Sequence, residues 1–255
     1  MSLIYDCVIC PIFTYGTGVW YKNATKAHAK RSLESAQRKA LLCITKACRT
    51  VATPALQVLA GKIAIDLLII MRGLHYAIRT GRHATYKECY DTPAGINNAD
   101  KTFKNNEKRR VRNALMGEWQ IRWQEGTKER QTYSFLPKVQ FTEEHRTWFQ
   151  PGLKTTFLIT GKGSLNASLF KIKQSESPNC PFCWDEEETS FHIIFHCAAY
   201  ETERIELAEE LGNLDDYEQD LGKLIKDKAS MSSLTNFANK VFEKRKTELE
   251  LRTLD

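Results

Sequence analysis

Three cysteines and two histidines fall within residues 180–197, in the order Cys180-x2-Cys183-x8-His192-x3-His196-Cys197. Thiolates and imidazoles at such spacings are the usual ligands of a structural zinc ion, because a Cys-x2-Cys loop brings two sulfurs to one metal. Four protein ligands complete a tetrahedron and leave no open position for catalysis. The stretch therefore predicts a structural Zn²⁺ site formed by Cys180, Cys183, His192 and Cys197.

The identity of the fourth ligand depends on the local backbone. In a regular helix His196 shares a face with His192, whereas Cys197 is rotated by about 140° from it. A frayed or tightened turn would favour Cys197, as in the His-x4-Cys half of zinc knuckles. We predict Cys197, with His196 as the alternative. The glutamates of the intervening loop, residues 186–188, are predicted to be solvated rather than ligating.

The composition is that of an ordinary folded protein. The 255 residues, 42% hydrophobic and 27% charged, are enough for one or two domains with real cores. The eight cysteines do not form a disulfide framework, which indicates a reduced, intracellular compartment. Cys7 and Cys10 have no nearby second pair, and core packing is predicted for them. No run approaches the about 18 apolar residues of a membrane span, so no membrane partner is expected.

Charge is distributed unevenly along the chain. The net charge is +6, but residues 1–178 carry 28 Lys/Arg against 13 Asp/Glu, whereas residues 179–255 carry 9 against 18. A strongly basic surface over two thirds of a chain predicts a polyanionic partner such as nucleic acid. Solvated helix faces are the alternative explanation.

The hydrophobic pattern predicts a mostly α fold. Helices are expected over residues 25–48, 53–61, 66–81, 104–126, 200–211 and 230–252. The first has an apolar stripe of Leu33, Ala36, Ala40, Leu41 and Ile44. Asp66 opens the third and Gly81 closes it. Residues 91–101 have the Pro/Gly/Asn composition of a linker, and residues 131–163 read as more extended and rich in turns.

Four stretches, in order, resemble the C-terminal part of non-LTR retrotransposon reverse transcriptases. They are YDCVICPIFTYGTGVW (5–20), QRKALLCITKACRTVATPALQVLAGKIAIDL (37–67), FLITGKGSLNASL (157–169) and CPFCWDEEETSFHIIFHCAAYETER (180–204). The likeness is to the Jockey-like group and to type-1 elements that insert into arthropod ribosomal DNA. The chain departs from the pattern at Lys162, where the family usually has His.

The resemblance implies an organisation in five segments. Residues 1–90 would be a thumb-like helical bundle, 91–130 a linker and basic helix, and 131–178 a connecting region with a Thr-Gly-Lys-Gly turn. Residues 179–204 would be the zinc knuckle, the core of a small zinc-stabilised C-terminal helical module, and 205–255 an acidic helical tail.

The resemblance also implies that catalysis belongs to other parts of the parent polyprotein, an RNA-directed DNA polymerase (a nucleotidyltransferase) with endonuclease activity. The Mg²⁺-binding polymerase carboxylates of the family lie on an aromatic-x-Asp-Asp turn upstream of the thumb. In this chain the only Asp-Asp pair is Asp215-Asp216, with Asn213 in place of the aromatic, and we expect it to be solvated surface. No Pro-Asp dipeptide of a restriction-like nuclease is present. We therefore expect no catalytic residue in this chain, and the polymerase site before it.

The predicted role is to hold the RNA template or target DNA during retrotransposition. The expected partners are the element transcript, the target site and the rest of the polyprotein, without a small-molecule substrate, in the nucleus at the target DNA with a cytoplasmic phase. Trp123 is expected either to stack on a base or to pack in the core. The cations expected to face phosphates are Lys30, Arg31, Arg38, Lys39, Lys46 and Arg49, and, in a second cluster, Lys108, Arg109, Arg110 and Arg112.

The alternative is a stand-alone zinc-stabilised module that binds protein, from a co-opted or decayed element. The helices at 200–211 and 230–252 would then expose apolar side chains to a partner, among them Leu234, Phe237, Val241 and Leu249. Salt-sensitive binding to RNA and DNA would favour the first role, and salt-insensitive protein binding the second.

Overall fold

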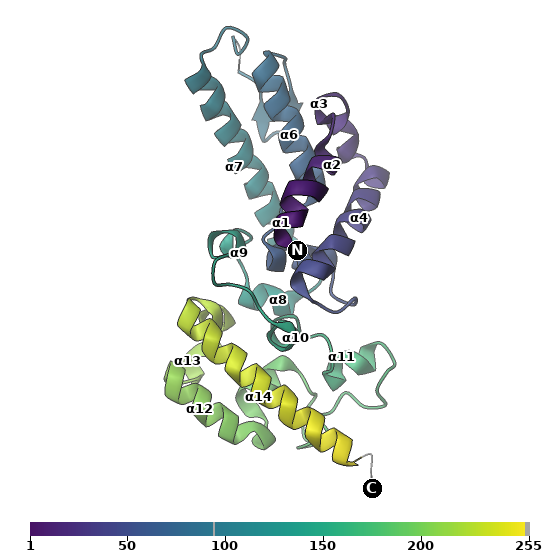
Figure 1. Cartoon of the computed structure of the whole chain (residues 1–255), viewed down its shortest axis with the longest axis vertical. Coiled ribbons are helices and arrows are strands. Elements are labelled where there is room, and N and C mark those ends of the chain that lie inside the picture. The colour runs from purple at the N-terminus through teal and green to yellow at the C-terminus, as the bar shows by residue number, and fades with distance from the viewer. Residues whose placement is uncertain (94, 253–255) are drawn as a thin grey trace. The chain divides into compact units, whose positions relative to one another are not determined.

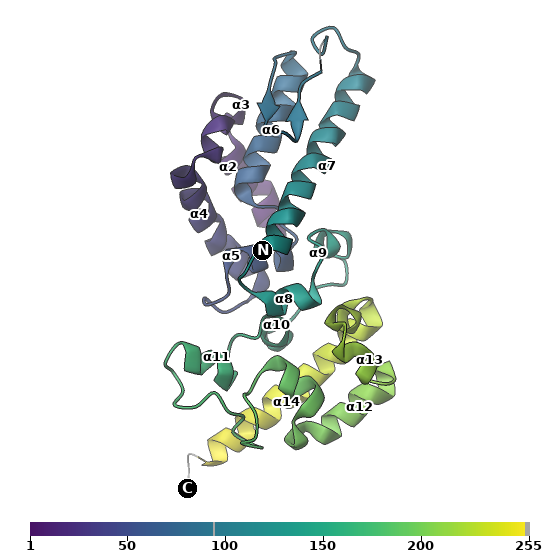
Figure 2. The same ribbon diagram turned by 180° about the vertical axis from the view of Figure 1, so that it is seen from behind.

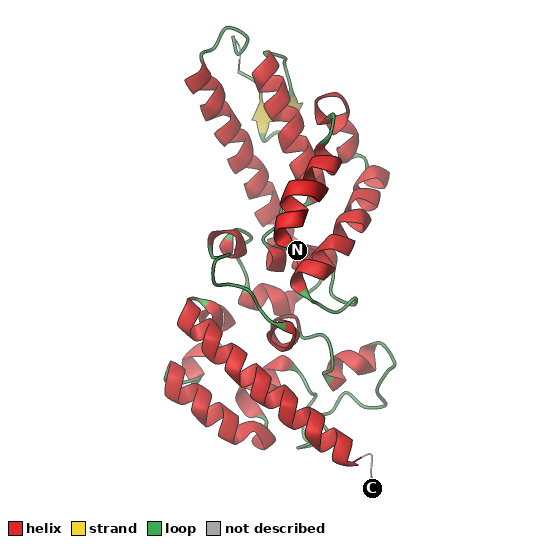
Figure 3. Cartoon of the chain, in the orientation of Figure 1, coloured by secondary structure: helices red, strands yellow, loops and turns green. Residues whose placement is uncertain are grey.

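The computed structural model describes residues 1–93 and 95–252, which are mostly helix (Figures 1 and 3). The predicted mostly α fold class is confirmed. The chain divides into two compact units. Unit 1 comprises Met1–Ile44 and Ala60–Gly126, and unit 2 comprises Thr45–Leu59 and Thr127–Asp255. These two units do not coincide with the five predicted segments.

Unit 1 is helical apart from one small hairpin, in which β1 (Thr85–Tyr86) pairs antiparallel with β2 (Tyr90–Asp91). Its helical elements are α1 (Ser2–Ile4), η1 (Tyr5–Ile9), α2 (Cys10–Thr14), α3 (Thr17–Trp20), η2 (Tyr21–Thr25), α4 (Ala27–Thr45), α6 (Ile65–Thr80) and α7 (Lys101–Glu125).

The helix α6 is the central element of unit 1. It packs against α2, α3, η2 and α7, and Figures 1 and 2 both show α7 running alongside it. The predicted end is confirmed, because Gly81 terminates α6 in the left-handed region at φ +70°. At Gly73 a Cβ would lie 2.2 Å from Cγ of Tyr21. The absence of a side chain there lets the backbone of α6 lie directly on the Tyr21 ring.

The basic helix predicted at 104–126 is α7, which starts at Lys101 after Asp100, whose carboxylate accepts from the Phe103 amide at 2.6 Å. Its apolar stripe is buried in unit 1. Arg122 donates to the carboxylate of Asp66 on α6 at 2.7 Å, and Asp66 is 1% exposed. Burial of a carboxylate requires such a partner. The buried side chains of this helix are therefore part of the core of unit 1.

The predicted apolar stripe of α4 is only partly correct. Ala36 is exposed, and Gln37 next to it is fully buried. The amide nitrogen of Gln37 donates to the Tyr5 hydroxyl at 2.7 Å and to the Ile63 carbonyl at 2.9 Å. Its amide oxygen accepts from the Ile65 backbone N–H at 3.2 Å. A polar side chain with distant partners thus occupies a core position that a pattern of apolar residues does not reveal.

Residues 131–163 of unit 2, expected to be extended and rich in turns, contain three short helices joined by turns and irregular chain. The helical elements of unit 2 are α5 (Thr53–Ala60), α8 (Arg130–Phe135), α9 (Phe141–Glu144), α10 (Leu153–Thr160), α11 (Asn166–Lys171), η3 (His192–His196), η4 (Ala198–Tyr200), α12 (Glu201–Leu211), α13 (Asp215–Glu218), η5 (Leu221–Ile225) and α14 (Lys228–Arg252).

The helix α14 is the central element of unit 2, not a tail. It packs against α10, α12 and η5, and Figure 1 shows α12 beside it. Leu234, Phe237 and Val241 are at most 2% exposed. The apolar face that the protein-binding alternative assigned to a partner is therefore covered by the chain itself, except for the half-buried Leu249.

Apolar side chains of α1 and α2 are exposed to solvent. Leu3 is 73% exposed and Ile12 is 69% exposed. Cys7 is exposed as well, so the prediction that it packs in a core is wrong, whereas Cys10 is half-buried.

Among the described residues no single helix combines the length and the hydropathy needed to cross a bilayer. Two bent pairs of helices, Ser2–Thr14 with Thr17–Thr25 and Thr53–Ala60 with Ile65–Thr80, reach these values only when each pair is taken together.

Candidate metal centre

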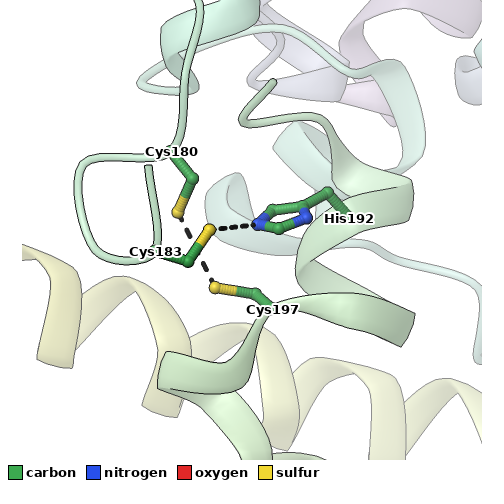
Figure 4. A group of neighbouring side chains, drawn as sticks. All are labelled: Cys180, Cys183, His192 and Cys197. Carbon is green, nitrogen blue, oxygen red and sulfur yellow. Dashed lines mark hydrogen bonds between the residues drawn. The ribbon is translucent and has the colours of Figure 1, made fainter. Parts of the chain in front are cut away.

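Four side chains of unit 2 converge on one point, as Figure 4 shows. The ligand atoms of Cys180, Cys183, His192 and Cys197 all lie within 4.8 Å of one another. The sulfurs of Cys180 and Cys197 are 3.7 Å apart, and the Cys183 sulfur is 3.3 Å from Nε2 of His192. Two sulfurs bound to zinc at about 2.3 Å in a tetrahedron would be about 3.8 Å apart. The residues therefore fit a metal such as zinc.

A tight loop places the first two cysteines. The backbone N–H of Cys180 donates to the Glu186 carbonyl at 2.8 Å, and the N–H of Trp184 donates to the Cys180 carbonyl at 3.0 Å. Trp184 takes the left-handed conformation with φ +63°. The backbone N–H groups of Phe182 and Cys183 donate to the sulfur of Cys180. The loop thus turns both thiols inward and stabilises negative charge on one of them.

A π-helical turn brings in the other two ligands. In η3 the N–H of Cys197 donates to the His192 carbonyl, five residues before it, at 2.8 Å. Such a turn holds more residues than an α-helical turn, so residue i+5 returns toward residue i. His196 faces Glu218 instead, with Nε2 3.1 Å from its carboxylate. Arg204 donates to the Cys197 carbonyl. The structure thus places Cys197, and not the alternative His196, in the cluster.

The imidazole of His192 is oriented by Glu186. Its Nδ1 lies 2.9 Å from the carboxylate, and the hydrogen bond from His192 lowers the pKa of Glu186. With Nδ1–H donating to Glu186, Nε2 keeps its lone pair for the centre. A carboxylate behind a ligating histidine is the usual way to fix the tautomer and ring orientation. Glu186 is one of the loop glutamates predicted to be solvated, and its side chain is 55% exposed.

Two of the thiols are coupled through a hydrogen bond. The bond to Cys197, with burial added, raises the pKa of Cys180. The same bond from Cys180 lowers the pKa of Cys197. Cys197 is therefore the first of the pair to become a thiolate, the form that binds a metal.

Glu188 is buried, and the prediction that it is solvated is wrong. Its carboxylate forms two hydrogen bonds with Arg245 of α14, at 2.7 and 2.9 Å, and side-chain exposure is 0% for Glu188 and 8% for Arg245. The same carboxylate accepts from the backbone N–H of Asn166 at 2.6 Å. Burial lowers the pKa of Arg245, but its bonds to Glu188 raise it, and the net shift is upward. The loop at residues 180–188, which carries Cys180, Cys183 and Glu188, is called the metal loop below. The ion pair thus joins the metal loop to α14, and the bond from Asn166 joins it to α11.

The predicted nucleic-acid contacts on α4 and after it are divided between the two units. Arg31 and Lys39 of unit 1 are exposed, and Lys30 lies 3.8 Å from Glu34. Arg38 is half-buried. The exposed Lys46 and Arg49 belong to unit 2.

On α7 the predicted cluster is mostly exposed, as at Arg109 and Arg112. Arg110 is paired with Glu107 at 3.0 Å, and Lys108 is half-buried. Trp123 is only 2% exposed. Its ring packs in the core and is not available to stack on a base, which corrects the stacking alternative.

The Asp215-Asp216 pair behaves as expected. Both residues are exposed in the short helix α13. Neither belongs to the metal cluster, which among the described residues is the only group of three or more His, Cys or acidic side chains close enough to share an ion.

The chain is similar over most of its length to proteins of type-1 retrotransposable elements. It is 32% identical over 251 residues to a 115 kDa protein of the element R1DM of Drosophila melanogaster, with 95% of this chain and 23% of that protein covered. The chain is a homologue of R1 retrotransposon Pol polyproteins. Two further relatives are Pol polyproteins from R1 elements of Bradysia coprophila (30% identity; 78% of this chain and 19% of that protein covered) and Nasonia vitripennis (28% identity; 96% and 58% covered). No protein-family model and no solved structure matches the chain significantly.

The chain spans less than a quarter of the length of the first two R1 relatives and just over half of the third. Identity extends through both units, since 95% of the chain is aligned with the R1DM protein.

The first prediction separates the two candidate fourth ligands. Cys197→Ala should abolish tight zinc binding by the full chain, whereas His196→Ala should retain one zinc per chain, because only Cys197 lies with the other three donors. Elemental analysis after dialysis, with competition against a chromogenic chelator, measures both. Loss of zinc from the His196 variant with retention in the Cys197 variant would reverse the assignment.

The second prediction concerns the buried ion pair. Glu188→Gln leaves the guanidinium of Arg245 buried without its counter-charge, and breaking a buried pair costs about 3–5 kcal/mol. Urea unfolding of the zinc-loaded chain should show this loss. The matched control is Glu243→Gln. Glu243 lies on the same helix as Arg245, and its substitution removes an ion pair with Lys154. The control should leave the midpoint of urea unfolding unchanged. Equal midpoints for the two variants would show that the pair is not a structural tie.

Proposed function

We propose that this chain is the part of an R1-type Pol polyprotein that holds RNA or DNA, with a structural zinc ion folding unit 2 and unit 1 supplying the phosphate contacts. The polymerase and endonuclease activities would belong to other parts of the polyprotein, and the site of action would be the nucleus at the target DNA.

The observation that carries the proposal is the separation of charge between the units. Unit 1 has 18 Lys/Arg against 9 Asp/Glu, a formal charge of +9, while unit 2 has 19 against 22, a formal charge of −3. A compact unit with this excess of positive charge attracts polyanions. Sequence-independent binding to a phosphate backbone follows from such a surface.

Exposure of the cations supports the same role. Arg31 and Lys39 on α4 and Arg109 and Arg112 on α7 are exposed. The half-buried Arg122 instead binds the buried carboxylate of Asp66. The basic excess of unit 1 is thus in large part a property of its surface.

The character of the metal centre supports a structural zinc. Cys180 and Cys197 are fully buried and His192 is 4% exposed. Four protein donors leave no position for a substrate, and the donor set of three cysteines and one histidine is typical of structural zinc. When bound, the ion would cross-link the loop after α11 to the turn before α12, and its binding free energy would stabilise the fold.

The protein-binding alternative assigned apolar side chains of α14 to a partner, and three of them are not accessible. Leu234, Phe237 and Val241 are buried within unit 2.

The third prediction tests the proposal through salt dependence. The full zinc-loaded chain should bind short RNA and DNA with affinities that fall steeply between about 50 and 200 mM salt. Arg31→Ala with Lys39→Ala should reduce the slope of log K against log salt by about 1.5, as expected when two phosphate contacts are lost. Fluorescence anisotropy of labelled oligonucleotides provides the measurement.

Its matched control is Lys226→Ala with Lys228→Ala, which removes the same charge from exposed positions of unit 2 and should leave the slope nearly unchanged. Weak, salt-insensitive binding of the oligonucleotides by the wild-type chain would contradict the proposed function. Protein binding would then be the better explanation.

A further inference from the structure

A cavity of about 550 Å³ opens in unit 1 between the turn that leads into α3 and the helices α6 and α7. This volume lies within the range of small-ligand sites, about 300–1,000 Å³. Its charged lining is contributed by Arg72 and Arg79 of α6 and Lys108 of α7. Of these, only Lys108 was among the residues that the sequence assigned to nucleic acid.

The lining contains two arginines and one lysine but no carboxylate. Among the described residues, none of Arg72, Arg79 and Lys108 forms an ion pair. Other cations of unit 1 with partners, such as Arg110 and Arg122, are bound by Glu107 and Asp66. Positive charges gathered around one hollow without counter-charges create a potential that an anion would relieve.

The hollow is held in shape by close packing around Tyr76. A Cβ on Gly18 would lie 2.5 Å from the Tyr76 ring, so the backbone of α3 rests on that ring. The guanidinium groups of Arg79 and Arg82 lie 5.4 and 5.7 Å from the ring centre, in cation–π geometry. The position of Arg79 at the cavity is therefore prearranged.

His75 connects the two helices that carry the cations. Its Nε2–H donates to the Lys108 carbonyl at 3.1 Å, which places Lys108 beside α6. Burial lowers the pKa of His75, and the nearby charges of Lys108, Arg72 and Arg112 lower it further. The imidazole is thus neutral at physiological pH and leaves the positive charge of the cavity to the arginines and the lysine.

We propose that this cavity binds the phosphodiester backbone of a nucleic-acid strand, with Arg72, Arg79 and Lys108 as the phosphate-binding groups. The inference rests on the proposed function of unit 1 and gives it a location. Guanidinium groups bind phosphate oxygens through paired hydrogen bonds, which a lysine cannot fully reproduce. The same cations could hold a free nucleotide, so the test must distinguish the two sources of phosphate.

The experiment uses the full zinc-loaded chain and the variant Arg72→Ala with Arg79→Ala. Both arginines are exposed, so the variant should keep the wild-type melting temperature. For labelled single-stranded RNA the slope of log K against log salt should fall by about 1.5, whereas Lys226→Ala with Lys228→Ala should not change it. The variant Arg72→Lys with Arg79→Lys keeps the positive charges and controls for misfolding. It should recover part of the slope of log K against log salt.

A local readout comes from the imidazole proton signals in NMR spectra. The His75 signal should move when unlabelled RNA is added, and that of His145 in unit 2 should not. Adenosine 5′-monophosphate at the same phosphate concentration should neither displace the RNA nor move the His75 signal.

The opposing results can be told apart. If the wild-type chain binds RNA and the double arginine variant behaves like the lysine control, the cavity assignment is overturned while the proposed function stands. If the nucleotide alone competes as well as RNA, the cavity takes free nucleotides and the strand assignment is overturned. If the wild-type chain binds neither RNA nor DNA, both the inference and the proposed function fail.

Discussion

The ion pair between Glu188 and Arg245 is the constraint on which unit 2 depends. Both charged groups are removed from water, which is tolerable only because each has the other and the carboxylate also accepts from the backbone of Asn166. The pair fixes the end of the metal loop against α14, the central helix of the unit. The four ligand side chains can converge because the loop and the π-helical turn are held in place by such contacts, including the bond from Arg204 to the Cys197 carbonyl.

The two units differ in the interactions that stabilise their cores and in the charge of their surfaces. Unit 1 is built around the apolar helix α6, with the Asp66–Arg122 pair as its buried polar tie, and its remaining cations give it a positive surface. Unit 2 has a slight acidic excess and contains the metal cluster. A metal-ligand cluster in the slightly acidic unit and a positive surface on the basic one are consistent with the proposed separate roles, in which zinc would maintain structure and unit 1 would bind nucleic acid.

The sequence could predict what depends on neighbouring residues. The ends of α6, the helix α7 and the four candidate ligands follow from local pattern and spacing. It could not predict what depends on distant partners or on irregular backbone. Glu188 is buried because Arg245 lies beside it, 57 residues later. Gln37 is buried because Tyr5 and Ile63 receive its hydrogen bonds. His196 satisfies regular helical spacing, and only the π-helical turn shows why Cys197 joins the cluster instead.

X-ray absorption at the zinc edge on the purified full chain would test the proposed zinc ion held by three sulfurs and one imidazole nitrogen. From the geometry of the cluster we expect three sulfurs at about 2.3 Å and one nitrogen at about 2.0–2.1 Å from the zinc. A shell of two sulfurs and two nitrogens would instead place His196 at the metal. A shell dominated by oxygen would show that this cluster does not hold the ion. Zinc would then not contribute to the folding of unit 2.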